Sequence, residues 1–291
     1  LRPFTPKPNV EKTLNAAGNT EVWLGGQKAA EEQGDTTATM YGIAIDIGTT
    51  TVVASLVDLH DGKELLSMSC LNSQKVFGQD VITRINFAMT HDRGTWAQQK
   101  TITKDLQTLI QGIYDEFNKT GEICANDVYD VTVGANNTMI HLLVGADPSS
   151  MGTTPYLPAF EGPQIVNGVK DLGLPVNPLC QVYCVPAVSS FVGGDITAGV
   201  LACGVHKKKD NVLFIDIGTN GEMVLSRGGR LCGCSCAAGP ALEGMNISCG
   251  VRAASGAIED VQITGEGENT EVKLSVIGGC APTGLCGSGI L

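Results

Sequence analysis

One motif occurs twice in this chain and decides its fold: Ile45-Asp46-Ile47-Gly48-Thr49 and Ile215-Asp216-Ile217-Gly218-Thr219. Each copy continues an apolar run, Tyr41–Ile45 in the first case and Val212–Ile215 in the second. A further strand-like run and a glycine-containing turn follow each copy, which is the pattern of a β-hairpin. Because the motif and its hairpin both recur, the sequence predicts a duplicated supersecondary unit and therefore two similar lobes.

The repeated loop suits a bound phosphate and a metal ion. Gly48 and Gly218 carry no side chain, so backbone N–H groups can approach phosphate oxygens there. Asp46 and Asp216 would repel phosphate directly, and they therefore need Mg²⁺ in between, usually bound through water. Two such loops facing each other would hold a polyphosphate from both sides. The candidate phosphate-binding residues are Gly48, Thr49, Thr50, Thr51, Gly218, Thr219 and Asn220.

Composition argues against several classes of function. The chain has 291 residues with 30 acidic and 19 basic side chains, and its net charge of −11 argues against nonspecific binding to nucleic acid or to an anionic membrane. Hydrophobic residues make up 43%, enough for a folded core, and no apolar run approaches the ~18 residues of a membrane span. The 11 cysteines include no Cys-x-x-Cys pair, so we expect reduced thiols and no iron–sulfur framework within this chain.

The remaining pattern predicts how the chain is organised. Residues 1–40, with several prolines at their start, are expected to be a linker or the tail of a preceding domain. Residues 41–210 would form the first lobe, and residues 211–291 the start of the second. Apolar spacing and capping residues predict helices at 79–93, at 98–117, from the Asn136 cap to Leu143 and at 195–203, and strands at 41–45, 52–59, 128–133, 182–188 and 212–215.

The two loops resemble the phosphate-1 and phosphate-2 motifs of the acetate and sugar kinase, heat-shock chaperone and actin superfamily. The resemblance implies an α/β fold: a duplicated, ribonuclease H-like, actin-like ATPase with two lobes around a nucleotide cleft that binds ATP and Mg²⁺. Asp195-Ile196-Thr197-Ala198 resembles the first connecting helix of that superfamily. Chaperone ATPases have, at the position of Asp195, a Glu that helps to hold the metal-bound water, so the candidate catalytic residues are Asp46, Asp195 and Asp216. A helix N-cap is an equally suitable role for Asp195.

Four finer motifs narrow the resemblance. They lie at Asn72 to Ile85, Val133 to Pro148, Ala237 to Gly244 and Gly284 to Ile290. Together they resemble the ATP-dependent reductive activators of corrinoid proteins, over residues 41–291. The resemblance implies an ATPase that drives the uphill one-electron reduction of an inactive Co(II) corrinoid protein, or corrinoid methyltransferase, to Co(I). It also implies that the electron comes from an iron–sulfur domain of the same polypeptide, a domain that this chain is expected to lack. The cysteine pattern, with reduced thiols, predicts a cytoplasmic protein.

Ala238-Gly239-Pro240 places small residues and a proline at a helix start, where bare N–H groups can bind an anion. By the resemblance, Gly239 and Pro240 would line the nucleotide cleft, and Glu243 would either face the site or support the helix dipole. An ordinary helix N-terminus packed against the core is the alternative.

Three cysteines alternate at Cys232, Cys234 and Cys236, so an extended strand would place them on one face, where we expect buried small residues. Cys236-Ala237-Ala238-Gly239 also resembles the activators of 2-hydroxyacyl-CoA dehydratases, whose iron–sulfur cluster is shared across a homodimer. That family's second cysteine has no counterpart in residues 207–215, so we expect Cys236 to be structural. His141 lies in an apolar helix and is expected to be a satisfied core histidine.

The second lobe looks truncated at its C-terminal end. A Gly-Gly segment that cradles adenine usually lies late in this lobe, and here Gly278-Gly279 is followed at once by the motif that ends the chain. We therefore expect weak, base-indifferent ATP binding by this chain alone. Two other functions stay open: a small-molecule kinase of the same superfamily, for which no substrate pocket is evident, and an actin-like nucleotide-dependent scaffold. The resemblance leaves the corrinoid partner and its methyl donor unspecified.

Overall fold

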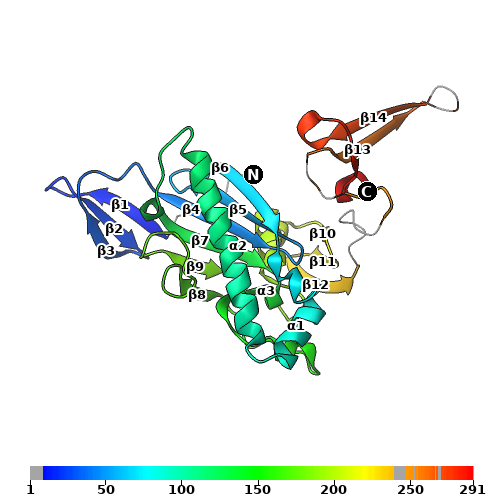
Figure 1. The fold of residues 1–291 in the computed structure, drawn as a ribbon, viewed down its shortest axis with the longest axis horizontal. Coiled ribbons are helices and arrows are strands. Elements are labelled where there is room, and N and C mark those ends of the chain that lie inside the picture. Colours follow the sequence, from blue (N-terminus) through cyan, green and yellow to red (C-terminus); the bar gives the residue numbers. More distant parts are fainter. Residues whose placement is uncertain are drawn as a thin grey trace. The chain divides into compact units, whose positions relative to one another are not determined.

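A computed structural model of the chain (Figure 1) describes residues 9–238, 247–251, 253, 255–265, 267 and 270–290. The chain divides into two compact units, Leu1–Gly199 and Val200–Leu291. The division falls within helix α4 (Gly194–Ala202), ahead of the lobe boundary at residues 210–211 that the sequence predicts.

A six-stranded sheet forms the centre of the first unit, made of β4 (Tyr41–Ile47), β5 (Thr51–Asp58), β6 (Glu64–Leu71), β7 (Val128–Ala135), β8 (Gln164–Asn167) and β9 (Gln181–Cys184). The strand order is β6-β5-β4-β7-β9-β8. β4, β7 and β9 run parallel, whereas β5 is antiparallel to β4 and β6, and β8 is antiparallel to β9. The carboxyl ends of the three parallel strands therefore lie at one edge, where open α/β sheets bind ligands.

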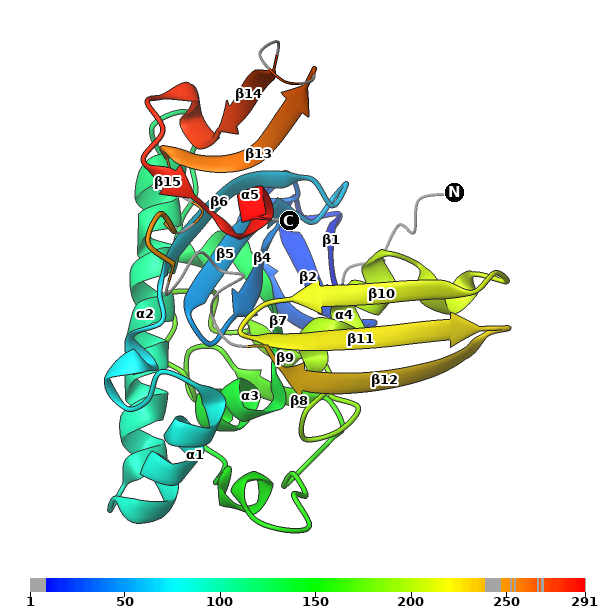
Figure 2. The ribbon, with the colours of Figure 1, turned by 90° about the vertical axis from the view of Figure 1, so that its right-hand side faces the viewer.

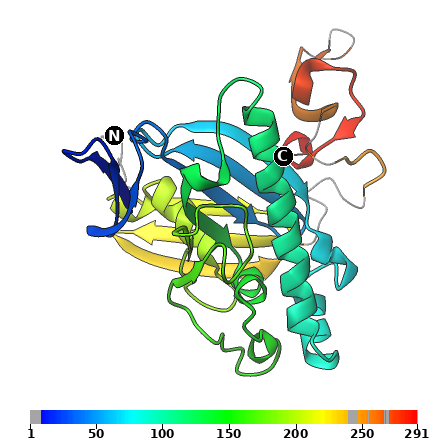
Figure 3. The ribbon, with the colours of Figure 1, turned by 60° about the vertical axis from the view of Figure 1, so that its left-hand side comes forward.

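Helix α2 (Gly94–Phe117) covers one face of this sheet (Figure 3). Its apolar residues recur at helical spacing, and Ile102, Leu106, Ile110 and Ile113 are fully buried. They belong to one cluster with the buried side chains of β4, β5 and β7. Burying one such side chain contributes about 1.5–3 kcal/mol, so this cluster is the main source of stability of the first unit.

The helices and strands predicted for residues 41–215 are confirmed, with bounds that differ by a few residues. The remaining helices of the first unit are α1 (Val81–Thr90) and α3 (Asn137–Val144). Asp80 caps α1 through a capping box with Thr83, and Gly145 ends α3 in the left-handed conformation. Single turns of 3₁₀-helix lie at Ser73–Val76, Ala125–Asp127, Ser149–Gly152, Val205–Lys207 and Ile277–Gly279.

Residues 10–32 form a sheet rather than an extended linker, which was the first of the two alternatives predicted for residues 1–40. The sheet consists of β1 (Val10–Leu14), β2 (Thr20–Leu24) and β3 (Gln27–Glu32), all antiparallel. Val10 and Val22 are fully buried, in a cluster with Met40 and Tyr129. Gly25 and Gly26 both have positive φ, as the two-residue turn of a hairpin requires. That turn was the available signal, and the prolines that suggested a linker lie in residues 1–8, outside the described part of the chain.

The second unit contains two small sheets (Figure 2). β10 (Val212–Ile217), β11 (Asn220–Arg227) and β12 (Arg230–Ala237) form an antiparallel meander. β13 (Ala257–Thr264) and β14 (Glu271–Val276) form a hairpin, to which β15 (Gly284–Leu285) adds in parallel. The short helix α5 (Gly287–Ile290) follows.

The three alternating cysteines lie on one face of β12, as predicted, but they are exposed rather than buried. Ile215 and Leu225 share this face through the strand register and are 50% and 43% exposed. The expectation of burial was wrong because alternation shows only that residues share a face and cannot show whether another element covers it. Among the described residues, no three His, Cys, Asp or Glu side chains are grouped as a metal site, and no helix is long and apolar enough to cross a membrane.

His141 is confirmed as a core histidine. It is fully buried, and its ring stacks on Phe160. Nε2 accepts a hydrogen bond from the N–H of Ala159 over 3.1 Å, so Nδ1 carries the proton and donates to the carbonyl of Asn137 over 2.8 Å. Burial lowers the pKa of His141, and both ring nitrogens are satisfied by a neutral imidazole.

Candidate functional site

The first repeated loop closes the hairpin between β4 and β5. The N–H of Gly48 donates to the carbonyl of Thr51 over 2.9 Å, and Ile47 pairs with Val52. A side chain at Gly48 would place its Cβ 2.7 Å from the carbonyl oxygen of Thr51, closer than such contacts allow. The turn itself therefore requires glycine, in addition to any approach of a ligand.

Asn72 holds the first loop through two hydrogen bonds to its backbone carbonyls. It is fully buried; its side-chain amide donates to the carbonyl of Gly48 over 2.8 Å, and its backbone N–H donates to the carbonyl of Thr50 over 2.9 Å. In a trans peptide the carbonyl and the following N–H point in opposite directions. The N–H groups of Thr49 and Thr51 are therefore directed away from Asn72, which is the orientation that a phosphate-binding loop needs.

Asn136 supports the same loop from a second direction. Its Oδ1 caps α3 by accepting from the N–H of Met139 over 3.0 Å, and its Nδ2 donates to the hydroxyl of Thr49 over 3.3 Å. The cap was predicted, but the contact with Thr49 was missed because the two residues are 87 positions apart. The available signal was that Asn136 directly follows β7, which pairs with β4.

Asp46 and Asp195 both neighbour Gly134, near the carboxyl end of β7. The parallel register of β4 and β7 places Asp46 beside Gly134. A Cβ on Gly134 would lie 3.8 Å from the Cα of Asp195. Asp46 is exposed and Asp195 is half-buried. Two of the three candidate catalytic residues are thus brought to neighbouring positions within the first unit.

Two glycines allow α4 to begin this close to β7. A Cβ on Gly193 would lie 2.5 Å from the Cα of Asn136, and a Cβ on Gly194 would lie 2.3 Å from the carbonyl oxygen of Val185. The N–H of Thr197 donates to the carbonyl of Gly193, so Gly193 occupies the cap position and Asp195 lies inside the first turn. The alternative role of Asp195 as the N-cap is therefore not the arrangement in the structure.

The second repeated loop closes the β10–β11 hairpin with a shorter turn. The N–H of Gly218 donates to the carbonyl of Asn220 over 3.0 Å, and Ile217 pairs with Gly221. In the first hairpin the corresponding pair is Ile47 with Val52, so that loop is one residue longer. Gly218, Thr219 and Asn220 make up the second turn, and all three are half-buried.

The shorter turn places Glu222 directly opposite Asp216, where the first hairpin has an apolar valine opposite its aspartate. Cross-strand partners share a face, so the two carboxyl groups lie on the same side of the sheet. The hydroxyl of Ser235 donates to Oε1 of Glu222 over 2.9 Å. Burial raises the pKa of Asp216; burial also raises the pKa of Glu222, and the charge of Asp216 adds to this shift. Such a pair suits a cation. The role of Glu222 was not predicted from the sequence, because its position opposite Asp216 depends on the length of the turn.

Three predicted nucleotide contacts, Gly239, Pro240 and Glu243, lie outside the described residues. The predicted residues Thr49, Thr50 and Thr51 lie together on the first loop, with only Thr49 buried. The first loop belongs to the first unit and the second loop to the second unit.

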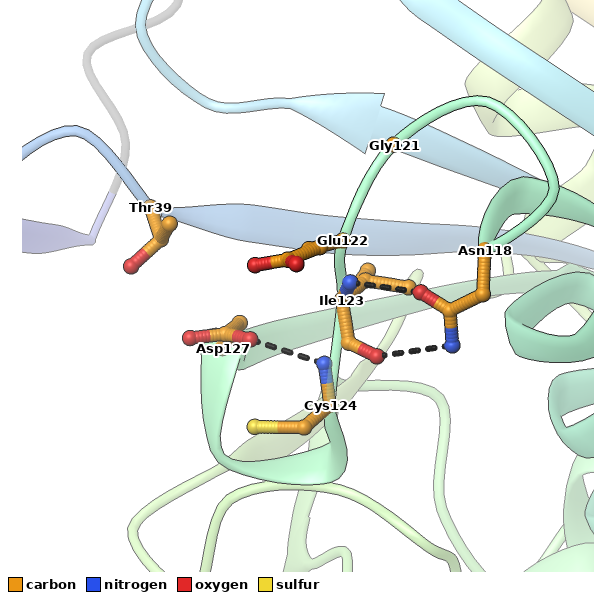
Figure 4. A pocket seen from close by; sticks show the side chains of 7 residues that line it. All are labelled: Thr39, Asn118, Gly121, Glu122, Ile123, Cys124 and Asp127. Carbon is orange, nitrogen blue, oxygen red and sulfur yellow. Dashed lines mark hydrogen bonds between the residues drawn. The ribbon is translucent and has the colours of Figure 1, made fainter.

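The first unit also contains a hollow of about 540 Å³, whose lining residues Figure 4 shows. Thr39 and Asp127, which line it, precede β4 and β7, so the hollow lies at the amino ends of the strands and the candidate site at their carboxyl ends. Polar groups of the loop that borders the hollow form hydrogen bonds with one another. Asn118 exchanges two hydrogen bonds with Ile123, and the N–H of Cys124 donates to Asp127. Burial raises the pKa of Cys124, which makes its thiol a poor nucleophile.

Comparisons with known proteins identify the family. The family model described as RACo middle region matches residues 41–208, and the model described as C-terminal domain of RACo, the ASKHA domain, matches residues 210–291. Corrinoid activation enzyme RamQ of Eubacterium limosum is 39% identical over 87% of this chain and 41% of its own length. The Co(II) methylated amine-specific corrinoid protein reductase of Methanosarcina barkeri is 28% identical over 78% of this chain and 42% of its own length.

A solved structure of a reductive activator for corrinoid, iron–sulfur protein matches with a TM-score of 0.84 and 39% identity, over 94% of this chain and 43% of that chain. The chain thus spans about two fifths of the length of these relatives. The match confirms the predicted α/β, actin-like ATPase fold. Because the family model for the middle region and the 39% identical relative each cover most of the chain, it belongs to the RACo family of reductive activators of corrinoid proteins.

Proposed function

We propose that this chain is the ATP-binding part of a reductive activator that returns a corrinoid protein from Co(II) to Co(I). The observation that carries the proposal is the pair of Asp-Ile-Gly-Thr hairpin loops in a chain that is 39% identical to a corrinoid activation enzyme. Two further relatives are named as a Co(II) corrinoid protein reductase and as a reductive activator. The electron would come from an iron–sulfur domain outside residues 1–291.

Oxygen ligands at both loops fit a Mg²⁺–nucleotide complex. Asp46 and Asp216 would hold the metal ion through water, and the N–H groups of Gly48–Thr51 and Gly218–Asn220 would hold phosphate oxygens. When bound, Mg²⁺ neutralises phosphate charge. The position of Glu222 opposite Asp216 supports a second carboxylate in the same shell.

Asp195 is the proposed catalytic residue of the first unit. Its place next to Gly134, which also neighbours Asp46, supports a role in orienting the attacking water or a metal-bound water. Its Oδ1 accepts a hydrogen bond from the N–H of Ile196 over 2.8 Å, which fixes the carboxylate at the start of α4. Gly239, Pro240 and Glu243 complete the proposed nucleotide contacts.

Uphill electron transfer sets a thermodynamic condition on this site. ATP can drive it only if the nucleotide state changes the affinity of the activator for one conformation or redox state of its partner. A clamp of two lobes whose closure depends on the terminal phosphate would supply that difference. We therefore expect the corrinoid protein to bind differently to the ATP and ADP states. Cytoplasmic location and a homodimeric state are part of the same proposal.

The test is anaerobic and uses a polypeptide of the relatives' length that carries this chain. A Co(II) corrinoid protein and a low-potential electron donor are mixed with it, and Co(I) is followed by its visible absorption. Co(I) should appear with Mg-ATP and fail to appear with a non-hydrolysable analogue. Equal rates with and without ATP would contradict the proposal, and phosphoryl transfer to a small acid or polyol would favour the kinase alternative.

A further inference from the structure

Arg84 on α1 is fully buried, and its side chain contacts the backbone of the first repeated loop. Its Nη2 donates to the carbonyl of Thr49 over 2.5 Å, and its Nε donates to the carbonyl of Gly78 over 3.0 Å. Its Nη1 lies 3.2 Å from the sulfur of Met139 and 3.4 Å from Oε1 of Gln74. The guanidinium thus meets two backbone carbonyls, a thioether and an amide, all of them neutral acceptors.

No acidic side chain within the described ranges forms an ion pair with Arg84. Burial lowers the pKa of Arg84 to about 10, and the charge of Asp80 opposes this shift. The side chain therefore stays protonated at neutral pH. A buried charge without a counter-ion carries a desolvation cost in the folded state, and the hydrogen bonds that Arg84 donates to the carbonyls of Thr49 and Gly78 oppose this cost.

The position of this charge explains its presence. The carbonyls of Gly48 and Thr50 are held by Asn72, and the carbonyl of Thr49 between them is held by Arg84. Because the carbonyl and the next N–H of a peptide point in opposite directions, Arg84 directs the N–H of Thr50 to the face of the loop that Asn72 leaves open. A cation on the carbonyl also polarises the peptide and strengthens its N–H as a donor.

We propose that Arg84 is a positioning residue for phosphate: it fixes the Thr49–Thr50 peptide, and the negative charge of a phosphate bound on the opposite face compensates its buried guanidinium. The inference rests on the proposed nucleotide-binding function and adds a residue that does not itself touch the ligand. It also gives a physical role to Arg84 within the Asn72 to Ile85 segment, one of the four motifs on which the family resemblance rests. Lysine cannot replace it fully, because one ammonium group cannot reach the carbonyls of Thr49 and Gly78 and the thioether together.

The test uses the 291-residue chain and Mg-tripolyphosphate, a probe that contains no base. Affinities are measured by calorimetry, and thermal midpoints are measured without ligand. Arg84→Met should weaken binding by at least tenfold at a temperature where the thermal midpoints show both proteins to be folded, and Arg84→Lys should show a smaller loss of affinity. Lys104→Met, which removes one exposed positive charge from α2, is the matched control and should bind as the wild type does.

Each other outcome contradicts the proposal in a recognisable way. Equal affinity of the wild type and Arg84→Met, with a lower midpoint for the variant, would make Arg84 a structural residue only. If Arg84→Met does not fold, Arg84→Lys decides, and wild-type affinity in that variant would overturn the assignment. Failure of the wild type itself to bind Mg-tripolyphosphate would overturn the proposed function, and the Arg84 assignment with it.

Discussion

The two repeated loops share five residues of sequence and differ in the length of their turns and in the side-chain hydrogen bonds described for them. The first loop is fixed by side chains from three directions: Asn72, Arg84 and Asn136 bind its carbonyls and a hydroxyl. In the described part of the second unit, the second loop is closed by the hydrogen bond from Gly218 to Asn220. It has instead a second carboxylate, Glu222, opposite its aspartate.

This difference shows what a repeated motif specifies. Asp-Ile-Gly-Thr sets a strand end and a glycine turn, and both copies form them. The length of the turn and the groups behind it come from elsewhere in the chain, so they are free to differ. The first loop is built to hold peptide groups in fixed directions, and the second is built to concentrate negative charge. We therefore expect the first loop to contribute mainly phosphate contacts and the second mainly metal binding.

The largest effect is expected from the two aspartates. In a polypeptide of the relatives' length, Asp46→Asn and Asp216→Asn should each reduce ATP-dependent Co(I) formation by about 10²-fold or more, the scale on which one electrostatic contact to a transition state acts. Circular dichroism should show an intact fold. A wild-type rate in both variants would break the assignment, and loss in only one would mean that a single loop carries the function.

The thermal midpoints of the same two variants provide a second comparison of the two loops. Burial raises the pKa of Asp216 above its ordinary value of 3.8, so its ionised form is disfavoured in the folded state. Removing that charge should therefore raise the thermal midpoint of the ligand-free chain at pH 7. Asp46 is exposed, so burial disfavours its charge less, and Asp46→Asn should raise the midpoint less than Asp216→Asn does.

Asp195→Ala should slow ATP hydrolysis by about 10²-fold, as expected for a group that orients water in a transition state. The affinity for ATP should change far less, since the contact is made mainly in the transition state. Single-turnover rates and equilibrium titrations separate the two quantities. If affinity, turnover and thermal midpoint all fall together, Asp195 stabilises the start of α4 and has no catalytic role.

A matched pair of glycines tests how the first unit places Asp195. Gly193→Ala creates a Cβ 2.5 Å from the Cα of Asn136, so it must move α4 away from β7 and should cost about 1–3 kcal/mol in the free energy of unfolding. Gly134→Ala places its Cβ 3.8 Å from Asp195, an ordinary contact, and should cost less. Urea unfolding gives both values. Equal losses would show that the approach of α4 is not the limiting contact.

The smallest expected effect is on the pH dependence of the free energy of unfolding, through His141. His141 lies in α3, whose cap Asn136 contacts Thr49. Burial lowers its pKa from 6.5, so the unfolded chain takes up a proton before the folded chain does. The contribution of His141 to stability is therefore complete above pH 6.5 and is lost as the pH falls towards the folded pKa. The free energy of unfolding should fall more steeply in this window for the wild type than for His141→Gln, and equal slopes would contradict this.

Much of the first unit could be predicted because its signals are local. Strand ends, the glycine turns, the α1 and α2 spacing and the Asn136 cap are all visible within a few residues. The β1–β3 sheet was not predicted, because the Gly25-Gly26 turn follows a proline-rich segment that is typical of a linker. The exposure of Cys232, Cys234 and Cys236 could not be predicted, because covering a sheet face depends on elements distant in sequence.

The two loops of the candidate site could be predicted from the sequence, but the side chains that contact them could not. Asn72 and Arg84 lie in the chain well after the loop that they hold, and no spacing rule connects a buried arginine to a particular carbonyl. Glu222 was hidden for another reason: its place opposite Asp216 follows from a turn one residue shorter than that of the first copy. The identical sequence of the two motifs predicted identical pairing, but the strand register differs between the two hairpins.

The most direct test of the central claim, that the repeated loops bind the nucleotide phosphates, is an amide-resolved NMR titration of this chain with Mg-ATP. Weak binding does not prevent the measurement. The amide resonances of residues 48–51 and 218–220 should shift most, the same resonances should respond to Mg-tripolyphosphate, and Asp46→Asn should reduce the response of the first group. Shifts confined to other regions, such as the hollow beside Cys124, with both loops unmoved, would contradict the account.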